Sequence, residues 1–414
     1  MRPFLKLLSA AMLVAISTSG LIPVAPAANA AVDAATVVST PNPAGSALDQ
    51  RIWSVSCSGV DFCAGVGSYS DGANDQTLAL LWNGQSWSQV NSPNPAGVSL
   101  SQKLLSVDCV SSDWCIAVGW YGVGVYTQEL ALLWDGSAWT QMDTSNIGGN
   151  LDDLFRSVAC SSTTSCMVVG ETNRVSGTAN ISARWDGSHW TELAIASPGS
   201  GSSVHQLWGV SCATAQWCAA VGTYLLPGYN TMSLIWNGST WINTEIPLPG
   251  GSSRLHELNG VSCLSPTWCV AVGRYNDGVA DRSMVLQWNG SAWSLVTSPN
   301  VGVNQRNVLN GVDCLTTQWC VAVGRYHNGI TSQTLVQQWN GSSWLALDSP
   351  NVGTDLYNVL YSVSCPVDWS CAAVGLAEND ADAAQNLAIA LTGPPPPSTT
   401  TTTSTEPIAP AFTG

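Results

Sequence analysis

Short runs of alternating apolar and polar residues, separated by turn-forming residues, fill most of the 414-residue chain. Between positions 309 and 351 four such runs follow one another, LNGVDC, CVAVGRY, TLVQQW and SSWLALDSP. Alternation over four to eight residues is typical of half-buried β-strands, and the segment shows no helical period of useful length. Pieces rich in Gly, Asn and Asp separate the runs, so the segment predicts four antiparallel strands joined by turns.

The four-strand unit recurs along the chain at a spacing of 51 or 52 residues, marked by two cysteines with five residues between them. These pairs are Cys57/Cys63, Cys109/Cys115, Cys160/Cys166, Cys212/Cys218, Cys263/Cys269, Cys314/Cys320 and Cys365/Cys371. A period near 50 residues with strand-like content is the signature of a repeat fold. Seven units predict an all-β fold, a seven-bladed β-propeller with four antiparallel strands per blade.

The two ends of the repeat region fit together. The seventh unit has a third strand in NLAIALTG, but prolines 394–397 follow it and its fourth strand is missing. At the other end, AATVVSTPNPAG (34–45) aligns with SWSQVNSPNPAG (86–97) of the first unit. We therefore predict that the N-terminal strand, at 34–39, completes the last blade and closes the ring, which removes an open sheet edge.

The segments outside the repeats indicate export. Residues 1–30 combine Arg2 and Lys6 with an apolar core (7–22) and the small residues Ala28-Asn29-Ala30, as in a secretory signal peptide. A membrane anchor is the alternative. Residues 31–393 form the propeller, and 394–414 form a Pro/Thr-rich disordered tail or stalk. We expect a secreted or cell-wall-associated protein.

Predicted export places the cysteines in an oxidising environment, where disulfides form. All fourteen fall into the seven local pairs, which predicts seven disulfides within blades and no free thiol. Zinc binding is the alternative, but a zinc site needs a second pair of ligands nearby, and equivalent pairs in adjacent blades lie far apart. Each short loop that a disulfide closes contributes about 2 kcal/mol in the chain-entropy model.

The charge balance limits the partners. The chain has 27 acidic and 12 basic residues and a net charge of −15. Nucleic acid and anionic membrane both require a basic face, so neither is an expected partner. We expect a monomer without a transmembrane segment in the mature chain, with a glycan or an extracellular protein as its partner.

The order of features in each unit resembles that of known propellers. A glycine ends the second strand, as in Val323-Gly324, where kelch-type blades carry a double glycine. The turn Asp186-Gly187-Ser188-His189-Trp190 looks like the Asp-box turn of sialidase-type propellers, one residue tighter. The SVSCxSxxxCxAVG pattern is similar to repeats in secreted actinobacterial proteins. Pro410 to Gly414 look similar to a sortase sorting motif without its leading leucine, which leaves open a clipped cell-wall anchor.

Candidate ligand-binding residues occupy equivalent positions in the blades. Seven residues before each first cysteine stands a polar residue, predicted to form a ring at one mouth of the central channel: Gln50, Gln102, Asp153, His205, His256, Asn307 and Asn358. On the same face we place Tyr275 and Tyr326, which end two second strands, and Arg274 and Arg325, which precede them. The alternatives are ordinary polar strand junctions and regular packing positions.

The numerous tryptophans predict packing rather than a sugar-binding surface. Twelve of the twenty flank the Asn/Asp-Gly turn between third and fourth strands, at which both central residues are expected to have positive φ. Because the pair recurs in every complete blade, we expect it to pack the outer hairpins against neighbouring blades. Trp114, Trp217, Trp268 and Trp319 are expected to shield the disulfides.

The function predicted from these observations is a non-catalytic binding or interaction module for a glycan or a protein. The first alternative is a glycan-cleaving hydrolase or lyase with acidic residues at the channel mouth, where Asp153, Glu171 and Glu257 are the acids considered, in separate blades. The second is a purely structural surface protein. No catalytic residue and no cofactor is predicted, with calcium at 378–382 as an alternative to a solvated loop.

Overall fold

The computed structural model describes residues 34–145, 147–149, 152–174, 177–195, 204–225, 228–251, 254–353, 355–366 and 370–393. The predicted signal peptide and the predicted tail lie outside these residues. The strands of blades 1 to 3 are β2 (Gln50–Gly59), β3 (Phe62–Ser70), β4 (Asp75–Trp82), β5 (Trp87–Val90), β6 (Gln102–Ser111), β7 (Trp114–Val123), β8 (Tyr126–Trp134), β9 (Trp139–Gln141), β10 (Asp153–Ser162), β11 (Ser165–Arg174), β12 (Gly177–Trp185) and β13 (Trp190–Glu192). Those of blades 4 to 7 are β14 (His205–Thr214), β15 (Trp217–Leu225), β16 (Tyr229–Trp236), β17 (Trp241–Asn243), β18 (His256–Ser265), β19 (Trp268–Asn276), β20 (Asp281–Trp288), β21 (Trp293–Val296), β22 (Asn307–Thr316), β23 (Trp319–His327), β24 (Ser332–Trp339), β25 (Trp344–Leu347), β26 (Asn358–Ser364), β27 (Ser370–Glu378), β28 (Ala384–Thr392) and β1 (Ala34–Val38).

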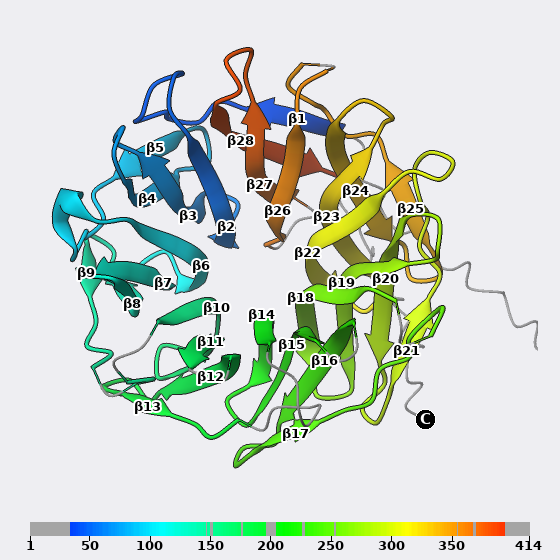
Figure 1. Ribbon diagram of the computed structural model, residues 1–414, viewed down its shortest axis with the longest axis horizontal. Coiled ribbons are helices and arrows are strands. Elements are labelled where there is room, and N and C mark those ends of the chain that lie inside the picture. Colours follow the sequence, from blue (N-terminus) through cyan, green and yellow to red (C-terminus); the bar gives the residue numbers. More distant parts are fainter. Residues whose placement is uncertain are drawn as a thin grey trace, which may run out of the picture. The chain divides into compact units, whose positions relative to one another are not determined.

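These strands form seven four-stranded antiparallel sheets arranged as a ring, which confirms the predicted propeller. Helix is confined, in the part of the chain that the structure describes, to one 3₁₀ turn, η1 (Gly97–Ser99). The first strand of every blade lies innermost and faces the central channel, and the later strands follow outward (Figure 1). The channel therefore takes its lining from β2, β6, β10, β14, β18, β22 and β26.

The ring is closed by the N-terminal strand, as predicted. Strand β1 pairs antiparallel with β28, from Ala34 opposite Thr392 to Val38 opposite Ala388. The last sheet therefore has the order β1-β28-β27-β26, in which the first and the last strand of the described residues share one blade (Figure 1). This pairing gives β28 a partner on its outer side, where an unpaired edge would otherwise be exposed.

The paired tryptophans pack the blades together. The two indole rings of each pair lie 5.5–5.9 Å apart, centroid to centroid, at a tilted angle. The second ring of each pair is buried, and its blade's core is shared with the preceding blade: Trp288 and Trp293, for example, cluster with Ala219 and Val221. The indole N–H of Trp293 also donates to Ser233 Oγ of that blade at 2.9 Å.

The Asn/Asp-Gly turn between third and fourth strands differs from the predicted one. Only its glycine has a positive φ, for example 87° at Gly84, and the expectation for both central residues is wrong. The turn has four residues, because Trp82 pairs directly with Trp87. The side chain of Asn83 stabilises the turn instead, because its Oδ1 accepts the backbone N–H groups of residues 85 and 86.

All seven predicted disulfides are present, and the described residues contain no free cysteine. Each joins the first two strands of one blade across a loop of five residues, with Cα atoms 3.9–4.1 Å apart. Such a set of bonds indicates an oxidising environment. In the part of the chain described here, no helix is long and apolar enough to cross a membrane.

The second cysteine of each pair lies in the apolar core, which keeps its sulfur atom away from the channel. Five of these cysteines have exposed fractions of only 0–2%: Cys115, Cys166, Cys218, Cys269 and Cys320. Each of the five belongs to a core cluster that its blade shares with a neighbouring blade. Their sulfur atoms are therefore out of reach of a ligand in the channel. The disulfides of these cysteines stabilise the blades and do not contact a ligand at the candidate site.

Side-chain hydrogen bonds join the innermost strands of neighbouring blades. Serines placed three residues before the first cysteine accept a backbone N–H from the next blade; Ser54 Oγ, for example, accepts from Val107 at 3.2 Å. The residue just before that cysteine, two positions further along the strand, also accepts a backbone N–H from the next blade. Ser56 accepts from Cys109 at 3.0 Å, and Asp108 Oδ2 accepts from Cys160 at 2.6 Å. The channel wall is therefore bonded from blade to blade by polar side chains.

One of these bonding residues predicts a pH dependence of stability. Burial raises the pKa of Asp108 from 3.8 to about 6, although the N–H of Cys160 opposes this rise. Folded Asp108 therefore keeps its proton to a higher pH than the unfolded chain does. Its contribution to stability is complete below about pH 4 and is lost as the pH rises through 6.

As the pH rises from 4 to 7, Asp108→Asn should therefore gain about 2 kcal/mol of stability relative to the parent, which loses this amount. Denaturant unfolding at the two pH values measures this difference. Asp113→Asn, in an exposed turn of the same blade, is the charge-matched control. A stability difference between Asp108→Asn and the parent that is the same at both pH values would contradict the argument.

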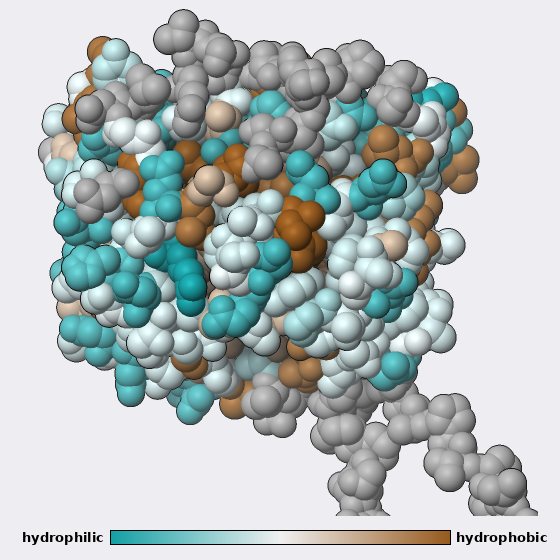
Figure 2. Space-filling view, turned by 90° about the horizontal axis from the view of Figure 1, so that it is seen from below, coloured by the Kyte–Doolittle hydropathy of each residue, from teal (hydrophilic) through white to brown (hydrophobic). Residues whose placement is uncertain are grey.

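The outer wall of the ring, seen edge-on in Figure 2, mixes hydrophilic and hydrophobic side chains. Among its outermost strands, Ile242 of β17 and Leu295 of β21 are exposed. Isolated exposed apolar residues of this kind are ordinary on soluble surfaces.

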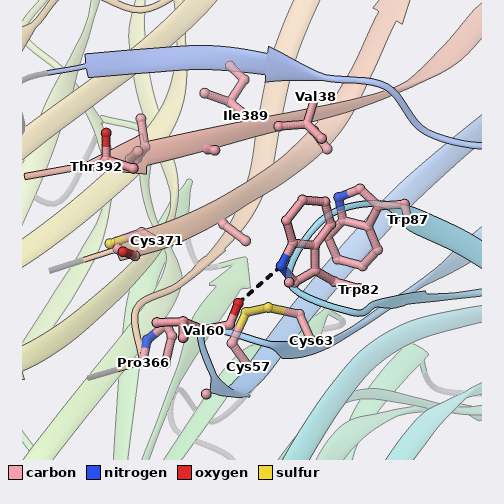
Figure 3. A pocket seen from close by; sticks show the side chains of 17 residues that line it. Val38, Cys57, Val60, Cys63, Trp82, Trp87, Pro366, Cys371, Ile389 and Thr392 are labelled. Carbon is pink, nitrogen blue, oxygen red and sulfur yellow. Dashed lines mark hydrogen bonds between the residues drawn. A yellow bond between two sulfur atoms is a disulfide. The ribbon is translucent and has the colours of Figure 1, made fainter. Parts of the chain in front are cut away.

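A cavity of about 280 Å³ lies at the junction of blade 7 with blade 1 (Figure 3). Val38 of β1, Ile389 of β28 and the Trp82/Trp87 pair line it. At five other junctions a Phe or Trp before the second cysteine joins the core between blades: Phe62, Trp114, Trp217, Trp268 and Trp319. Blade 7 has Ser370 at this position, and blade 3 has Ser165.

Candidate functional site

A β-bulge in every innermost strand builds the mouth of the channel. In β2, Ile52 pairs with Gly67 and Ser54 with Val66, so Trp53 has no partner and is the extra residue of the bulge. The same register shift occurs in all seven blades. The bulged residues are Trp53, Leu105, Arg156, Trp208, Asn259, Asn310 and Tyr361. Bulges re-aim side chains, and here they direct seven different ones toward the channel.

The Val-Gly pattern of the repeat makes this geometry possible. Gly67 lies opposite the bulge, where a Cβ atom would come within 1.9 Å of the Arg51 carbonyl oxygen. The equivalent glycines of the other six blades show the same approach at 1.9–2.0 Å. Any larger residue would push the two strands apart, so the glycine of each unit is needed for the bulge beside it.

The bulged residues form the floor of a cavity of about 520 Å³ at one end of the channel. Its wall comes from residues two positions before the bulge and from their partners on second strands. These wall residues are Lys103, Trp120, Leu154, Glu257, Arg274, Val308 and Arg325. We name the whole cavity the channel mouth. Its volume lies within the range of small-molecule sites in proteins.

Two aromatic groups face the channel mouth from opposite sides of the ring. On one side Trp53 and Tyr361, from blades 1 and 7, lie in contact with ring centroids 4.5 Å apart and a tilted interplanar angle of 36°. On the other side Trp208, from blade 4, carries the guanidinium of Arg156 4.2 Å from its ring centroid. Strands β2 and β26 lie across the ring from β10 and β14 (Figure 1), so the two groups flank the channel.

Most charges of the channel mouth are held in ion pairs. Lys103 Nζ lies 2.7 Å from Asp75, and Arg156 bonds to Glu171. Arg274 bonds to Glu257 at 2.6 Å and to Asp281 at 3.1 Å. The geometry fixes these side chains in place and leaves their outer faces on the cavity.

The seven predicted ring residues lie at the start of the innermost strands, but their side chains are buried, with exposed fractions of 0–5%. Most bind the backbone of the loop that leads into their own strand. Gln102 accepts from Ala96 N–H and donates to the Gly97 carbonyl, and Asn307 accepts from and donates to Val301. His256 faces two carbonyl oxygens, those of Arg254 and Pro249, at 2.9 Å.

Gln50 and Asn358 form equivalent bonds to their own loops. His205 lies 3.4 Å from the Thr178 carbonyl oxygen and stacks on Tyr224. A ligand in the channel mouth would meet the residues one and three positions further along each strand. That any of the ring residues contacts a ligand stays a prediction.

The predicted tyrosines and arginines divide between two surfaces. Tyr275 and Tyr326 pair with His256 and Asn307 and pack against the cores between blades. Arg274 and Arg325, one residue earlier, point to the other side of the sheet and line the channel mouth. This division follows from the alternation of side chains along a strand.

The acids considered for catalysis are not in three separate blades, and that expectation is wrong. Asp153 and Glu171 lie on the paired strands β10 and β11 of blade 3. Asp153 is buried, and its charge contributes, after the larger effect of burial, to raising the pKa of Glu129 to about 7. Glu257 is the acid that lines the channel mouth, where Arg274 holds it.

The loop considered for calcium is organised by an amide. Asn379 Oδ1 accepts the N–H groups of Ala381 and Ala383, and Asn379 Nδ2 donates to the Ser46 carbonyl at 2.6 Å. Across the described ranges, no three His, Cys, Asp or Glu side chains are grouped so as to hold a metal ion. Calcium binding at this loop stays a prediction.

The bulged residues were not predicted from the sequence, although a signal for them exists. They stand four residues before each first cysteine, where the repeat varies between aromatic, aliphatic, amide and cationic residues. The position two residues earlier, which also lines the channel mouth, varies as widely, from Lys103 to Glu257 and Val308. The recurring apolar residue between them (Ile52 in the first blade) faces the core. Variable positions in an otherwise regular repeat mark the places where the blades differ in what they present to the channel.

Comparisons with known proteins concern the architecture. No protein family and no curated protein matches the chain. Among solved structures, the polysaccharide lyase Uly1 is 9% identical, with a TM-score of 0.49, over 85% of this chain and 90% of its own. The fucose-recognising lectin of Aleuria aurantia, a six-bladed propeller, is 11% identical, with a TM-score of 0.40, over 69% and 94%. Chaetomium thermophilum Sqt1 bound to the N-terminus of ribosomal protein L10 is 11% identical, with a TM-score of 0.44, over 80% and 84%. The chain is a seven-bladed β-propeller with a disulfide in each blade and a channel mouth built from bulged residues.

Proposed function

We propose that this protein is a non-catalytic binding module that holds its ligand at the channel mouth. The observation that carries the proposal is the pair of aromatic groups, Trp53 with Tyr361 and Trp208 with Arg156, on opposite sides of a 520 Å³ cavity. Flat aromatic faces bury apolar ring surfaces at little entropic cost, and polar neighbours orient the ligand. Of the two ligand classes expected from the sequence, a glycan and a protein, a glycan suits these faces.

The disulfides support the same proposal. Seven disulfides form and persist outside the reducing cytosol, where glycans and cell-wall polymers are available as ligands. The charged groups of the mouth are mostly cations in fixed ion pairs, an arrangement that positions a ligand. We therefore place the protein outside the cell, secreted or associated with the cell wall.

A glycan and cell-wall polymer array, run together with a product-release assay on the same polymers, tests the proposal. We expect binding without release of product. Release that is lost in Glu257→Gln would replace the proposal with the hydrolase or lyase alternative. The absence of both binding and release would favour a purely structural surface protein.

A further inference from the structure

Cations dominate the lining of the channel mouth, although the whole chain is acidic. The chain has a net charge of −15, whereas four of the five charged residues that line this cavity are cations: Lys103, Arg156, Arg274 and Arg325. The charges of the first three are balanced by the acids Asp75, Glu171, Glu257 and Asp281. This leaves Arg325 as the cation that an anionic ligand would neutralise.

Arg325 differs from the other three cations. Within the described residues, no carboxylate lies within 4.0 Å of its guanidinium, whereas the other three each have one. Its Nη1 donates to the hydroxyl of Tyr357 at 2.6 Å, and its Cζ lies 5.8 Å from that ring centroid. This contact orients the guanidinium and occupies one of its five N–H donors.

A second donor stands near Arg325. Tyr361 lines the same cavity, and burial raises the pKa of its hydroxyl to about 12 although Arg51 and Arg325 act in the opposite direction. The hydroxyl therefore keeps its proton at neutral pH and is available as a donor to a ligand. The same ring contacts the Trp53 ring at a tilted angle, and we call these two rings the platform. A donor pair and the platform therefore lie together on one side of the mouth.

We propose that the ligand at the channel mouth is an acidic glycan whose uronic acid carboxylate binds Arg325 and the Tyr361 hydroxyl while its sugar ring lies on the Trp53/Tyr361 platform. This inference rests on the proposed function and specifies its ligand class. A planar guanidinium matches a carboxylate with two parallel hydrogen bonds. One unneutralised cation suits the single charge of a carboxylate better than the higher charge of a phosphate ester.

Calorimetric titration with uronic acid oligosaccharides tests the inference. The probes are oligogalacturonate, oligoalginate and hyaluronan oligosaccharides, each with its carboxyl-reduced neutral counterpart, and a phosphorylated oligosaccharide as the other anion. We expect at least one uronate to bind ten-fold or more tightly than its reduced counterpart. Its affinity should fall with rising salt, because the contact is ionic.

Arg325→Gln should weaken that binding about ten-fold, as expected for a lost charged hydrogen bond. Arg306→Gln is the matched control, since it removes the same charge from a side chain that is 74% exposed and outside the cavity. Equal affinity for acidic and reduced probes, no effect of Arg325→Gln, or binding of the phosphorylated probe alone would overturn the inference and leave the binding module standing. The absence of binding to every probe and to every polymer of the array would overturn both.

Discussion

A chain that begins at Ser39, and so lacks β1, should unfold on the order of 10 °C below the parent. Five residues of β1 pair with β28, and each backbone hydrogen bond lost contributes roughly 1 kcal/mol. A loss of several kcal/mol lowers Tm by about 2–4 °C per kcal/mol in a domain of this kind. The truncation also exposes the edge of β28 and opens the ring between blades 7 and 1.

Thermal unfolding of the truncated and parent proteins measures this effect. Two point variants refine it. Val38→Asp places a charge against the cavity between blades 7 and 1 and should lower Tm, whereas Val37→Asp, at a side chain 46% exposed, should leave Tm near that of the parent. A truncated protein that melts with the parent would show that the ring does not depend on this strand.

The fold could be predicted from the sequence because repetition amplifies a weak signal. A single run such as TLVQQW does not distinguish a strand from a short buried helix, but seven copies at a fixed spacing leave one architecture. The closure followed from the alignment of 34–45 with 86–97, and the disulfides followed from cysteines that pair locally in every unit. All of these are confirmed by the register of β1 on β28 and by the seven bonds.

The position of the candidate site could not be predicted in the same way. The ring was predicted from equivalent positions at the start of the first strands, but alternation turns Lys103 and Leu105, and not Gln102, toward the channel, and the bulge at Leu105 changes the alternation beyond it. A bulge depends on pairing with Gly119 of the neighbouring strand, which a reading of one strand does not contain. The prediction of positive φ at both central turn residues was wrong because hydrogen bonds to the side chain of Asn83 hold the turn.

Arg274 and Arg325 were predicted on the face of the channel mouth from their position before a tyrosine. The structure places both arginines in the lining of the channel mouth. Their roles differ through contacts that only the structure reveals, since Arg274 is held by Glu257 and Asp281, and Arg325 by the hydroxyl of Tyr357.

The account's central claim is that the aromatic groups of the channel mouth bind the ligand. The most direct measurement is the affinity of Trp53→Ala/Trp208→Ala for the glycan that the parent binds most tightly on the array. Each removed aromatic anchor costs roughly 1–2 kcal/mol of binding free energy, so we expect a loss of about 100-fold. The control is Ile242→Ala/Leu295→Ala, which truncates two exposed side chains on outer strands.

Unfolding curves first establish that both double variants keep the fold of the parent. Compared with the parent, we then expect a dissociation constant about 100-fold higher for Trp53→Ala/Trp208→Ala and an unchanged dissociation constant for the control. A folded Trp53→Ala/Trp208→Ala protein that binds the glycan as tightly as the parent would contradict it.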